Sequence, residues 1–373
     1  MTQHTKIEIQ EFLLWDKIRA RRGIVSFDLE ITPRCNNDCR HCYINVPAGD
    51  QYARSQELTL QEISTLADQA VELGAVWVLI SGGEPLLRDD FIEIYMLLKR
   101  KGLLVSVFTN ATLICDKHIA LFKKYPPRDI EITVYGATQE TYERVTCRQG
   151  SFSSFMHGLN KLLETGVKVR LKAMAIRSNF QELAAIAAFC RGHTKDYFRF
   201  DPQLHLRFDR NEERNILIKS ERLTPEEIVA LERADDERFT LLRKECDNLI
   251  NDEFAQNCDD HLFHCGLGTN SFNVSYDGKF RLCSSLWAPE TMYDLRQGSL
   301  RDAWENFVPK VRAMRSRRPE LLQNCRSCPI VNLCLWCPAH SYLEIGELDT
   351  PIEYFCQVAR ARAASIQGEN KAG

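Results

Sequence analysis

Several features common in other protein classes are absent from this chain of 373 residues. No apolar stretch approaches the roughly 18 residues that a membrane-spanning helix needs. The first residues, MTQHTKIEIQEF, are polar and lack the hydrophobic segment of a secretion signal. The formal net charge is −3, without the basic excess typical of nucleic-acid-binding proteins. These absences predict a cytoplasmic protein that has neither a membrane nor a nucleic acid as its partner.

Cysteine, by contrast, is abundant, with 15 residues in the chain. The cytoplasm is reducing, so disulfides are rare there, and clustered cysteines indicate a metal site or catalysis. Isolated ones such as Cys115, Cys190 and Cys246 are explained well enough as small buried apolar side chains. The remaining cysteines fall into groups with short, regular spacings, which that explanation does not cover.

Six short runs rich in apolar and β-branched residues predict strands, at 27–32, 76–80, 103–108, 129–135, 167–176 and 197–201. Helix-like segments separate them, and one opens with a capping box in which Thr59 pairs with Glu62. Strands alternating with helices predict βα units and a parallel sheet. Six units are too few for a closed eight-stranded barrel, so we expect an α/β fold with an open, partial (βα)6 barrel.

The pattern changes after the sixth strand. A charged region follows, with one helix expected to start at Thr224 and Pro225. From about residue 255 to 360 cysteine becomes dense and regular periodicity fades. This second part is predicted to be a small domain held together by metal rather than by a large core.

The most informative motif is C-x3-C-x2-C, formed by Cys35, Cys39 and Cys42 directly after the first predicted strand. Three thiolates on one short loop can hold three irons of a cubane cluster and leave the fourth iron without a protein ligand. A structural zinc site would need four closed ligands instead. The motif therefore predicts a cluster with an open position for chemistry.

A second motif, SGGEPLLR, follows the second predicted strand. Gly82 and Gly83 let the backbone turn tightly and approach a ligand, and their N–H and C=O groups are expected to be free to bond a ligand's amine. Glu84 adds a negative charge, and Pro85 fixes the path of the chain beyond the turn. The carboxyl ends of neighbouring parallel strands lie together, so this turn should lie beside the cysteine loop.

Together these two motifs resemble those of the radical S-adenosylmethionine (SAM) superfamily, over roughly residues 26–210. The resemblance implies that Cys35, Cys39 and Cys42 hold a [4Fe–4S] cluster whose open iron binds SAM. An electron from the cluster would cleave SAM, and the resulting 5′-deoxyadenosyl radical would abstract a hydrogen atom from a substrate.

The same resemblance implies further SAM contacts, for which ordinary turn or surface roles are the alternative. Tyr43 takes the aromatic position near adenine, and Thr109-Asn110 is similar to the family's TNG turn, with Ala111 in place of Gly. The other positions carried over as cofactor-binding are Thr133, Arg144 and Asn179, Arg144 as a partner of the SAM carboxylate and Asn179 as a contact of the ribose.

The C-terminal cysteines form the skeleton C-x6-C-x12-G-x4-C followed by C-x2-C-x5-C-x2-C and a final cysteine. This array resembles the SPASM domain, which binds auxiliary iron–sulfur clusters. The resemblance implies one [4Fe–4S] cluster on Cys258, Cys265, Cys283 and Cys337, with Cys258 as the least certain ligand. It implies a second on Cys325, Cys328, Cys334 and Cys356. The alternative is a zinc site on Cys325, Cys328, Cys334 and Cys337.

With these resemblances the expected domains can be stated. They are an N-terminal extension (1–25), a radical SAM core (26–210), a helical linker (211–254), an SPASM domain (255–360) and a C-terminal tail (361–373).

Our leading functional hypothesis is an enzyme that modifies a side chain of a ribosomally made peptide or protein by oxidation or crosslinking. The phrases EITVYGATQETYERVT and FRFDP resemble such peptide maturases. Only about 25 residues precede the first strand, so we expect a separate leader-recognition protein or a substrate that needs none. A flavodoxin or ferredoxin is the expected electron donor. One alternative is a tetrapyrrole-modifying radical SAM enzyme, and another is a non-catalytic iron–sulfur or zinc scaffold.

Some residues bear on the substrate. Ser284 follows Cys283 where sulfatase-maturating relatives place an acidic residue, which argues against the same chemistry here. Cys147 stands where similar proteins often have Gly, and a harmless replacement is favoured over a radical-site thiol. The stretch RFDPQLHLRFDR extends the sixth strand, and surface charge pairs are favoured over substrate contacts for Arg199, Asp201, His205, Arg207 and Asp209.

Overall fold

The computed structural model describes residues 22–246, 259–266 and 268–369. Within these residues the main element is a sheet of nine strands in the order β11–β10–β9–β1–β4–β5–β6–β7–β8. Neighbouring strands from β1 to β8 in this order are parallel. They match the six predicted strands: β1 (Ser26–Thr32), β4 (Trp77–Gly82), β5 (Leu104–Phe108), β6 (Asp129–Val134), β7 (Val169–Met174) and β8 (Arg199–Asp201).

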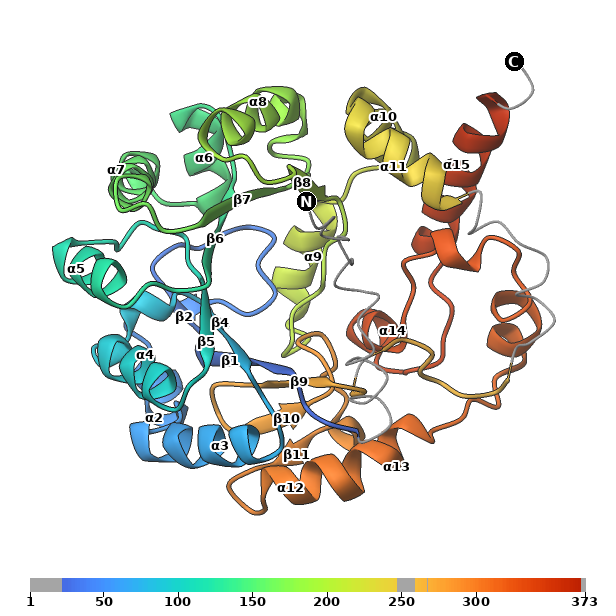
Figure 1. Ribbon diagram of the computed structural model, residues 1–373. Helices are drawn as coiled ribbons and strands as arrows, with labels where there is room; N and C mark the ends of the chain where they lie inside the picture. The colour runs from blue at the N-terminus through green and yellow to red at the C-terminus, as the bar shows by residue number, and fades with distance from the viewer. Residues whose placement is uncertain (1–21, 247–258, 267, 370–373) are drawn as a thin grey trace, which may run out of the picture.

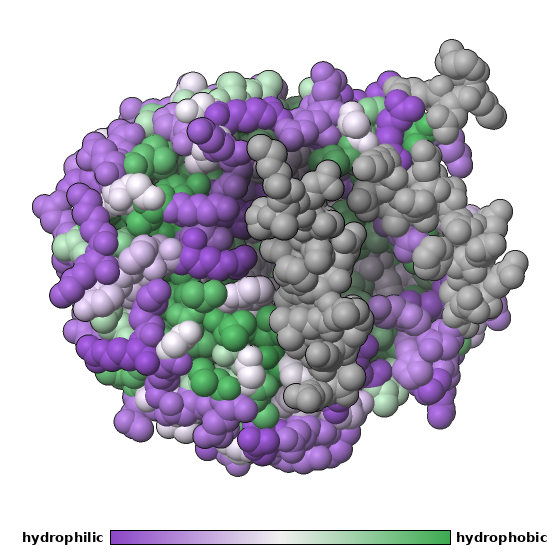
Figure 2. Space-filling view, in the orientation of Figure 1, coloured by the Kyte–Doolittle hydropathy of each residue, from purple (hydrophilic) through white to green (hydrophobic). Residues whose placement is uncertain are grey.

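The sheet is curved and open, and helices cover its outer face (Figure 1). The prediction of a partial barrel followed by a small cysteine-rich domain is therefore confirmed. The capping box of Thr59 and Glu62 is present at the start of α3. The covering helices are α2 (Gln51–Gln56), α3 (Leu60–Glu72), α4 (Phe91–Arg100), α5 (Asp116–Lys124), α6 (Gln139–Thr146), α7 (Ser151–Leu163) and α8 (Leu183–His193). Their solvent side is mostly polar along the visible rim (Figure 2).

Successive side chains of a strand point to opposite sides, so one face of each parallel strand packs in the core and the other faces the interior of the open barrel. On β1, Phe27, Leu29 and Ile31 are buried in the core between sheet and helices, whereas Asp28 and Glu30 line the inner cavity. The same alternation holds in β6, where Ile130 and Ile132 lie in the core and Glu131 lines the cavity. A closed barrel fills its interior with branched apolar side chains. The interior of this half-open one contains charged side chains beside apolar ones such as Leu79 and Phe108.

The segment predicted as a helical linker forms α9 (Glu212–Ser220), α10 (Pro225–Ala234) and α11 (Asp236–Cys246). The α10 helix begins as predicted, with Thr224 and Glu227 in a capping box and Pro225 in the first turn. It packs on α15 (Glu353–Glu369), which crosses the boundary expected at residue 360. None of the helices in the described ranges is long and apolar enough to span a membrane.

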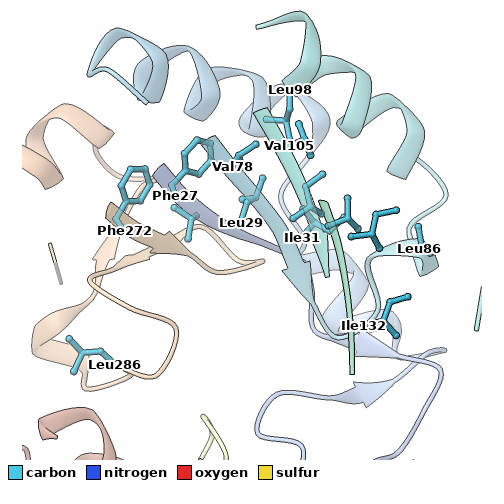
Figure 3. Packing of buried hydrophobic residues seen from close by; sticks show 14 of the residues in the cluster. Phe27, Leu29, Ile31, Val78, Leu86, Leu98, Val105, Ile132, Phe272 and Leu286 are labelled. Carbon is cyan, nitrogen blue, oxygen red and sulfur yellow. The ribbon is translucent and has the colours of Figure 1, made fainter. Parts of the chain in front are cut away.

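The cysteine-rich part continues the first sheet, which the sequence did not predict. Strand β9 (Ser271–Val274) pairs in parallel with β1, and β10 (Lys279–Arg281) and β11 (Tyr293–Asp294) add two antiparallel strands. Phe272 of β9 stacks on Phe27 of β1 with 5.2 Å between ring centroids (Figure 3). The remaining helices include α12 (Leu300–Asp302), α13 (Val308–Arg312) and α14 (Pro338–Ile345).

A fully buried ion pair joins the two parts beneath the cavity. Arg281 of β10 donates from Nη2 to Glu30 Oε2 of β1 at 2.6 Å and to Asn273 Oδ1 of β9 at 2.5 Å. Its Nη1 donates to the Ser284 carbonyl at 2.7 Å, and its guanidinium lies 3.5 Å from the Trp287 ring centroid. Glu30 and Arg281 have at most 1% of their side chains exposed, so neither charge has water to replace its partner.

We predict that Arg281→Ala lowers the free energy of unfolding by about 3–5 kcal/mol, because it leaves the Glu30 carboxylate buried without a cation. The double variant Glu30→Gln/Arg281→Met should recover most of this loss. As a control, Arg301→Ala removes an exposed pair with Glu305 and should cost at most about 1 kcal/mol. Anaerobic denaturant unfolding measures all three, and equal effects of Arg281→Ala and Arg301→Ala would contradict the prediction.

Candidate active site

The three cysteines of the first motif line a single cavity of about 340 Å³ at the carboxyl ends of the parallel strands. Their loop leaves β1, and its two arms pair as β2 (Arg34–Cys35) and β3 (Val46–Pro47). Burial raises the pKa of the Cys35 thiol to about 12 and that of Cys39 well above its usual value. Bare thiolates are therefore unfavourable here, and a cationic group bound to all three would stabilise them. The thiols fit the predicted cluster.

The base of this loop is held by buried charges. Arg34 is 5% exposed and donates from Nε to Glu57 Oε1 at 2.7 Å and from Nη1 to the Ala48 carbonyl at 3.1 Å. Arg88, the last residue of the second motif, donates from Nη1 to the carbonyls of Ile31 at 3.0 Å and Leu58 at 2.9 Å. These contacts fix the direction in which the chain leaves β1, and no sequence motif indicated them.

Gly82 and Gly83 lie directly against the start of the cysteine loop. The Gly83 N–H donates to the Thr32 carbonyl at 2.7 Å, and the Glu84 N–H donates to the Arg34 carbonyl at 2.9 Å. A Cβ atom on Gly82 would lie 2.2 Å from the Thr32 oxygen, and one on Gly83 would lie 2.3 Å from the Arg34 oxygen. The expectation of a free N–H group is therefore wrong for Gly83. The two hydrogen bonds attach the turn to the cysteine loop.

Glu84 has no exposed surface and does not line the cavity, nor does Pro85. The Glu84 carboxylate accepts hydrogen bonds from the Asn110 N–H at 2.7 Å, the Thr109 hydroxyl at 2.8 Å and the Leu86 N–H at 3.1 Å. Burial raises its pKa to about 7. Instead of facing the cavity, as a direct SAM contact would, Glu84 joins the turn after β4 to the turn after β5.

The turn after β5 reaches the cysteine loop. Asn110 donates from Nδ2 to Asn36 Oδ1 at 2.9 Å, and the same nitrogen lies 3.8 Å from Cys35 Sγ. Ala111 adopts φ 62°, the left-handed conformation for which the Gly of the resembling motif is suited. Ala111 thus adopts the backbone conformation that the Gly of a TNG turn would adopt, although this conformation is strained for Ala.

Of the nine residues predicted to contact SAM, five line the cavity: Tyr43, Gly82, Gly83, Asn110 and Thr133. Besides Glu84 and Pro85, Arg144 and Asn179 lie outside it. Arg144 donates from Nη2 to the Ser178 carbonyl at 2.8 Å and to the Thr141 hydroxyl at 2.9 Å. Asn179 joins β6 to β7, because its Nδ2 donates to the carbonyls of Tyr135 at 3.0 Å and Met174 at 2.9 Å. Both side chains hydrogen-bond within the protein, and their contacts with SAM stay predictions.

Charged residues on the inner face of the strands complete the cavity, and the motif search missed most of them. Glu131 forms ion pairs with Lys172, which also lines the cavity, and with Arg199 at 2.6 Å. Burial raises the pKa of Asp28 to about 6, and Arg281 opposes that shift. The alternation of apolar and polar residues in FDLEIT and DIEITV was the signal that could have identified them.

The stretch after β8 divides into two groups. Asp201 and His205 line the cavity, so for them a substrate contact is open. Arg199 pairs with Glu131, and Arg207 pairs with Asp209 at 2.8 Å, as expected for charge pairs. Arg207 is nevertheless 4% exposed, and its Nη1 donates to the Asn45 carbonyl at 2.9 Å, which supports the far side of the cysteine loop.

Cys147 is the left-handed C-cap of α6, with φ 51°, and it is exposed. It does not line the cavity.

The C-terminal cysteines separate into two groups in space. Cys325, Cys328, Cys334 and Cys356 line one cavity of about 590 Å³. Burial and, after it, the neighbouring thiols of the group raise the pKa of Cys325 and of Cys334 to about 11. Four thiols around one space fit a cluster on these residues.

The other group lies closer to the sheet. Cys283 and Cys265 are the charged neighbours that raise the pKa of Cys337, after burial as the main cause. Cys258, the fourth expected ligand, is outside the described residues. Cys337 therefore lies near Cys283 and Cys265. It does not line the cavity of Cys334, where the zinc alternative would need it. No group of three or more His, Cys, Asp or Glu side chains in the described ranges forms a site for a single metal ion.

Comparisons with known proteins agree with this architecture. Residues 29–190 match the family model of the radical SAM superfamily, and residues 265–329 match that of SPASM, an iron–sulfur cluster-binding domain. An AdoMet-dependent heme synthase of Methanosarcina barkeri is 25% identical over 342 residues, which cover 85% of this chain and 92% of that protein.

Two solved structures share the fold. SuiB of Streptococcus suis bound to its precursor peptide SuiA has a TM-score of 0.69 and 14% identity, over 96% of this chain and 84% of SuiB. The enzyme anSMEcpe with bound AdoMet has a TM-score of 0.63 and 14% identity, over 94% of this chain and all of that one. At this identity the likeness concerns the fold alone.

We predict that Gly83→Ala prevents assembly of the cluster on the first motif, because the new methyl group would collide with the Arg34 carbonyl. Reconstituted protein should lose roughly four irons per chain. Gly49→Ala is the matched control, since no atom lies within 4 Å of its added Cβ. Iron analysis and electron paramagnetic resonance (EPR) measure the loss, and an equal iron content in both variants would refute the steric argument.

The grouping of the C-terminal thiols gives a second prediction. Cys334→Ala/Cys356→Ala removes two ligands of one cluster and should lose roughly four irons, whereas Cys337→Ala/Cys356→Ala affects two clusters and should lose roughly eight. Cys190→Ala, a buried cysteine of α8, should lose none. Iron and labile sulfide are measured after anaerobic reconstitution. Equal losses in the two double variants would show that the grouping is incorrect.

Proposed function

Because the chain combines a radical SAM domain with a C-terminal SPASM domain, we propose that this radical SAM enzyme abstracts a hydrogen atom from a side chain of a ribosomally made peptide or protein. The observation that carries the proposal is the cavity where Cys35, Cys39 and Cys42 meet the Gly82-Gly83 turn at the carboxyl ends of the strands. A [4Fe–4S] cluster bound there would supply the electron that cleaves SAM to the 5′-deoxyadenosyl radical.

The protein's own part is to hold the reactants together and apart from water. Tyr43, Asn110 and Thr133 would provide an aromatic face and polar groups toward SAM, and charged residues of the strands line the same cavity. Such positioning lowers the entropic barrier of the hydrogen transfer. Oxidation or crosslinking of the substrate radical would follow, with the SPASM clusters as electron acceptors.

Charged side chains in the cavity are one argument for a peptide. Asp28, Glu30, Glu131, Lys172 and Asp201 line it, beside apolar side chains such as Leu79, Phe108 and Met174. The polar groups of a peptide can pair with these charges, and an apolar part of its side chain can lie against the apolar residues. The fold shared with SuiB, which was solved bound to its precursor peptide SuiA, is consistent with this.

A tetrapyrrole substrate is the second candidate. The match to a heme synthase over 92% of that protein favours it, since the match includes both domains. The two candidates are separated by offering short precursor-like peptides and iron coproporphyrin to the reconstituted enzyme. Mass spectrometry then shows which compound changes mass and increases 5′-deoxyadenosine formation. As further partners we propose a flavodoxin or ferredoxin donor and a separate leader-recognition protein.

We predict that the triple variant Cys35→Ala/Cys39→Ala/Cys42→Ala forms no 5′-deoxyadenosine with SAM and reductant, because the cluster that reduces SAM has lost its ligands. The C-terminal clusters should remain, leaving roughly eight irons per chain. The readouts are chromatography of the nucleoside and iron analysis. SAM cleavage by this variant would disprove the assigned role, and bound zinc without labile sulfide in the native protein would favour a scaffold.

A further inference from the structure

The side-chain amide of Asn110 lies next to the first cysteine of the cluster motif. Its Nδ2 atom is 3.8 Å from Cys35 Sγ, within the range of a hydrogen bond to sulfur, and 2.9 Å from Asn36 Oδ1. Both Asn110 and Cys35 line the cavity at the carboxyl ends of the strands. The amide therefore approaches a sulfur atom that would bind iron.

The direction of this contact is fixed by a main-chain donor. The two ends of an asparagine amide are told apart by their hydrogen-bond partners. The Thr112 N–H can only donate, and it lies 2.9 Å from one end of the Asn110 amide, so that end is the oxygen. The end that faces Cys35 is then the NH2 group, which donates two hydrogens and accepts none.

The neighbouring amide agrees with this assignment. Asn36 Oδ1 accepts from Asn110 Nδ2, so the other end of the Asn36 amide is its NH2 group, which donates to the Thr112 hydroxyl at 2.8 Å. The hydroxyl in turn donates to Asn110 Oδ1 at 2.7 Å, which closes a ring of hydrogen bonds. If the Asn110 amide were reversed, its NH2 group would face the Thr112 N–H. If the Asn36 amide were reversed, two NH2 groups would face each other.

The turn that carries Asn110 is also held by a buried carboxylate. Glu84 Oε2 accepts from the Asn110 main-chain N–H at 2.7 Å, and Glu84 has no exposed surface. The Cys35 sulfur accepts a second hydrogen bond, from the Asn37 main-chain N–H at 3.4 Å. Cys35 therefore has one donor from its own loop and one from the turn after β5.

We propose that Asn110 acts through the Cys35 thiolate: its amide N–H donates a hydrogen bond to that sulfur and raises the reduction potential of the [4Fe–4S] cluster bound there. The inference rests on the radical SAM part of the proposed function and is independent of the substrate. Reduction adds one negative charge, which the iron and sulfur atoms share. A hydrogen directed at sulfur therefore stabilises the reduced cluster more than the oxidised one, so the cluster accepts an electron more easily.

The potential is measured on the reconstituted holoenzyme without SAM or substrate, so that a contact between Asn110 and SAM has no influence. The EPR signal of this cluster is the one that the triple variant Cys35→Ala/Cys39→Ala/Cys42→Ala lacks. Asn110→Leu has a similar size but no donor. At the native midpoint potential, its ratio of reduced to oxidised cluster should be roughly three- to tenfold lower than in the native protein. An unchanged ratio would refute the proposal.

Thr112→Val is the matched control. It removes the hydroxyl from the ring of hydrogen bonds and keeps the main-chain N–H that orients the Asn110 amide. The midpoint potential of this variant should stay close to the native value. An equal shift in Asn110→Leu and Thr112→Val would show that the ring as a whole sets the potential, and would overturn the role of the contact with sulfur.

A second measurement uses the native sequence, so it does not depend on cluster assembly in Asn110→Leu. Protein labelled with ¹⁵N only in its asparagine side-chain amides is reduced and examined by pulsed EPR. We expect a ¹⁵N coupling in the signal of this cluster. Asn37→Leu removes another amide that lines the cavity and should keep the coupling. Absence of the coupling in the native protein, or its loss in Asn37→Leu, would contradict the proposal.

Both measurements are made without a peptide. If no peptide is turned over, the substrate of the proposed function is wrong, and the potential and the coupling still decide the role of Asn110.

Discussion

The close contact of Gly82-Gly83 with Thr32–Arg34 is the constraint on which the active site depends. Two backbone N–H groups donate across it, and a single methyl group at either glycine would come within 2.3 Å of a carbonyl oxygen. No side chain lies between the two segments, so the loop that carries the cysteines and the turn after β4 are placed by main-chain atoms. Glu84 extends the same arrangement to the turn after β5.

The parallel strands were predictable because their apolar residues bury one face against helices. The starts of α3 and α10 were predictable from the capping boxes at Thr59 and Thr224. The same sequence segments also contain charged residues that face the inside of the open barrel. Asp28, Glu131 and Lys172 stand at alternate positions within runs that look simply hydrophobic. Period two assigns them to the side opposite the core, and a sheet too short to close leaves that side open.

The candidate site was predictable only where the chemistry is local. Three thiols within eight residues predict a cluster site, and two adjacent glycines predict a tight turn, from the local sequence alone. Arg144 and Asn179 do not, because the partner of a long or polar side chain is chosen by tertiary packing. Their side chains bind the carbonyls of Ser178 and Tyr135, which no local pattern indicates. Strands β9 and β10 are four and three residues long, too short to show a period, and so their pairing with β1 gave no signal in advance.

The ladder between β1 and β9 has a consequence for dissection of the protein. Cutting the chain before residue 271 would expose the main-chain groups of β1 along an edge that is central in the intact sheet. It would also remove Arg281, the buried cation that pairs with the Glu30 carboxylate. An uncovered, flat and apolar strand invites pairing with a second copy of itself. The first two hundred residues resemble a separable catalytic domain. Expressed alone they should self-associate, because β9 of the cysteine-rich part covers the edge of their sheet at β1.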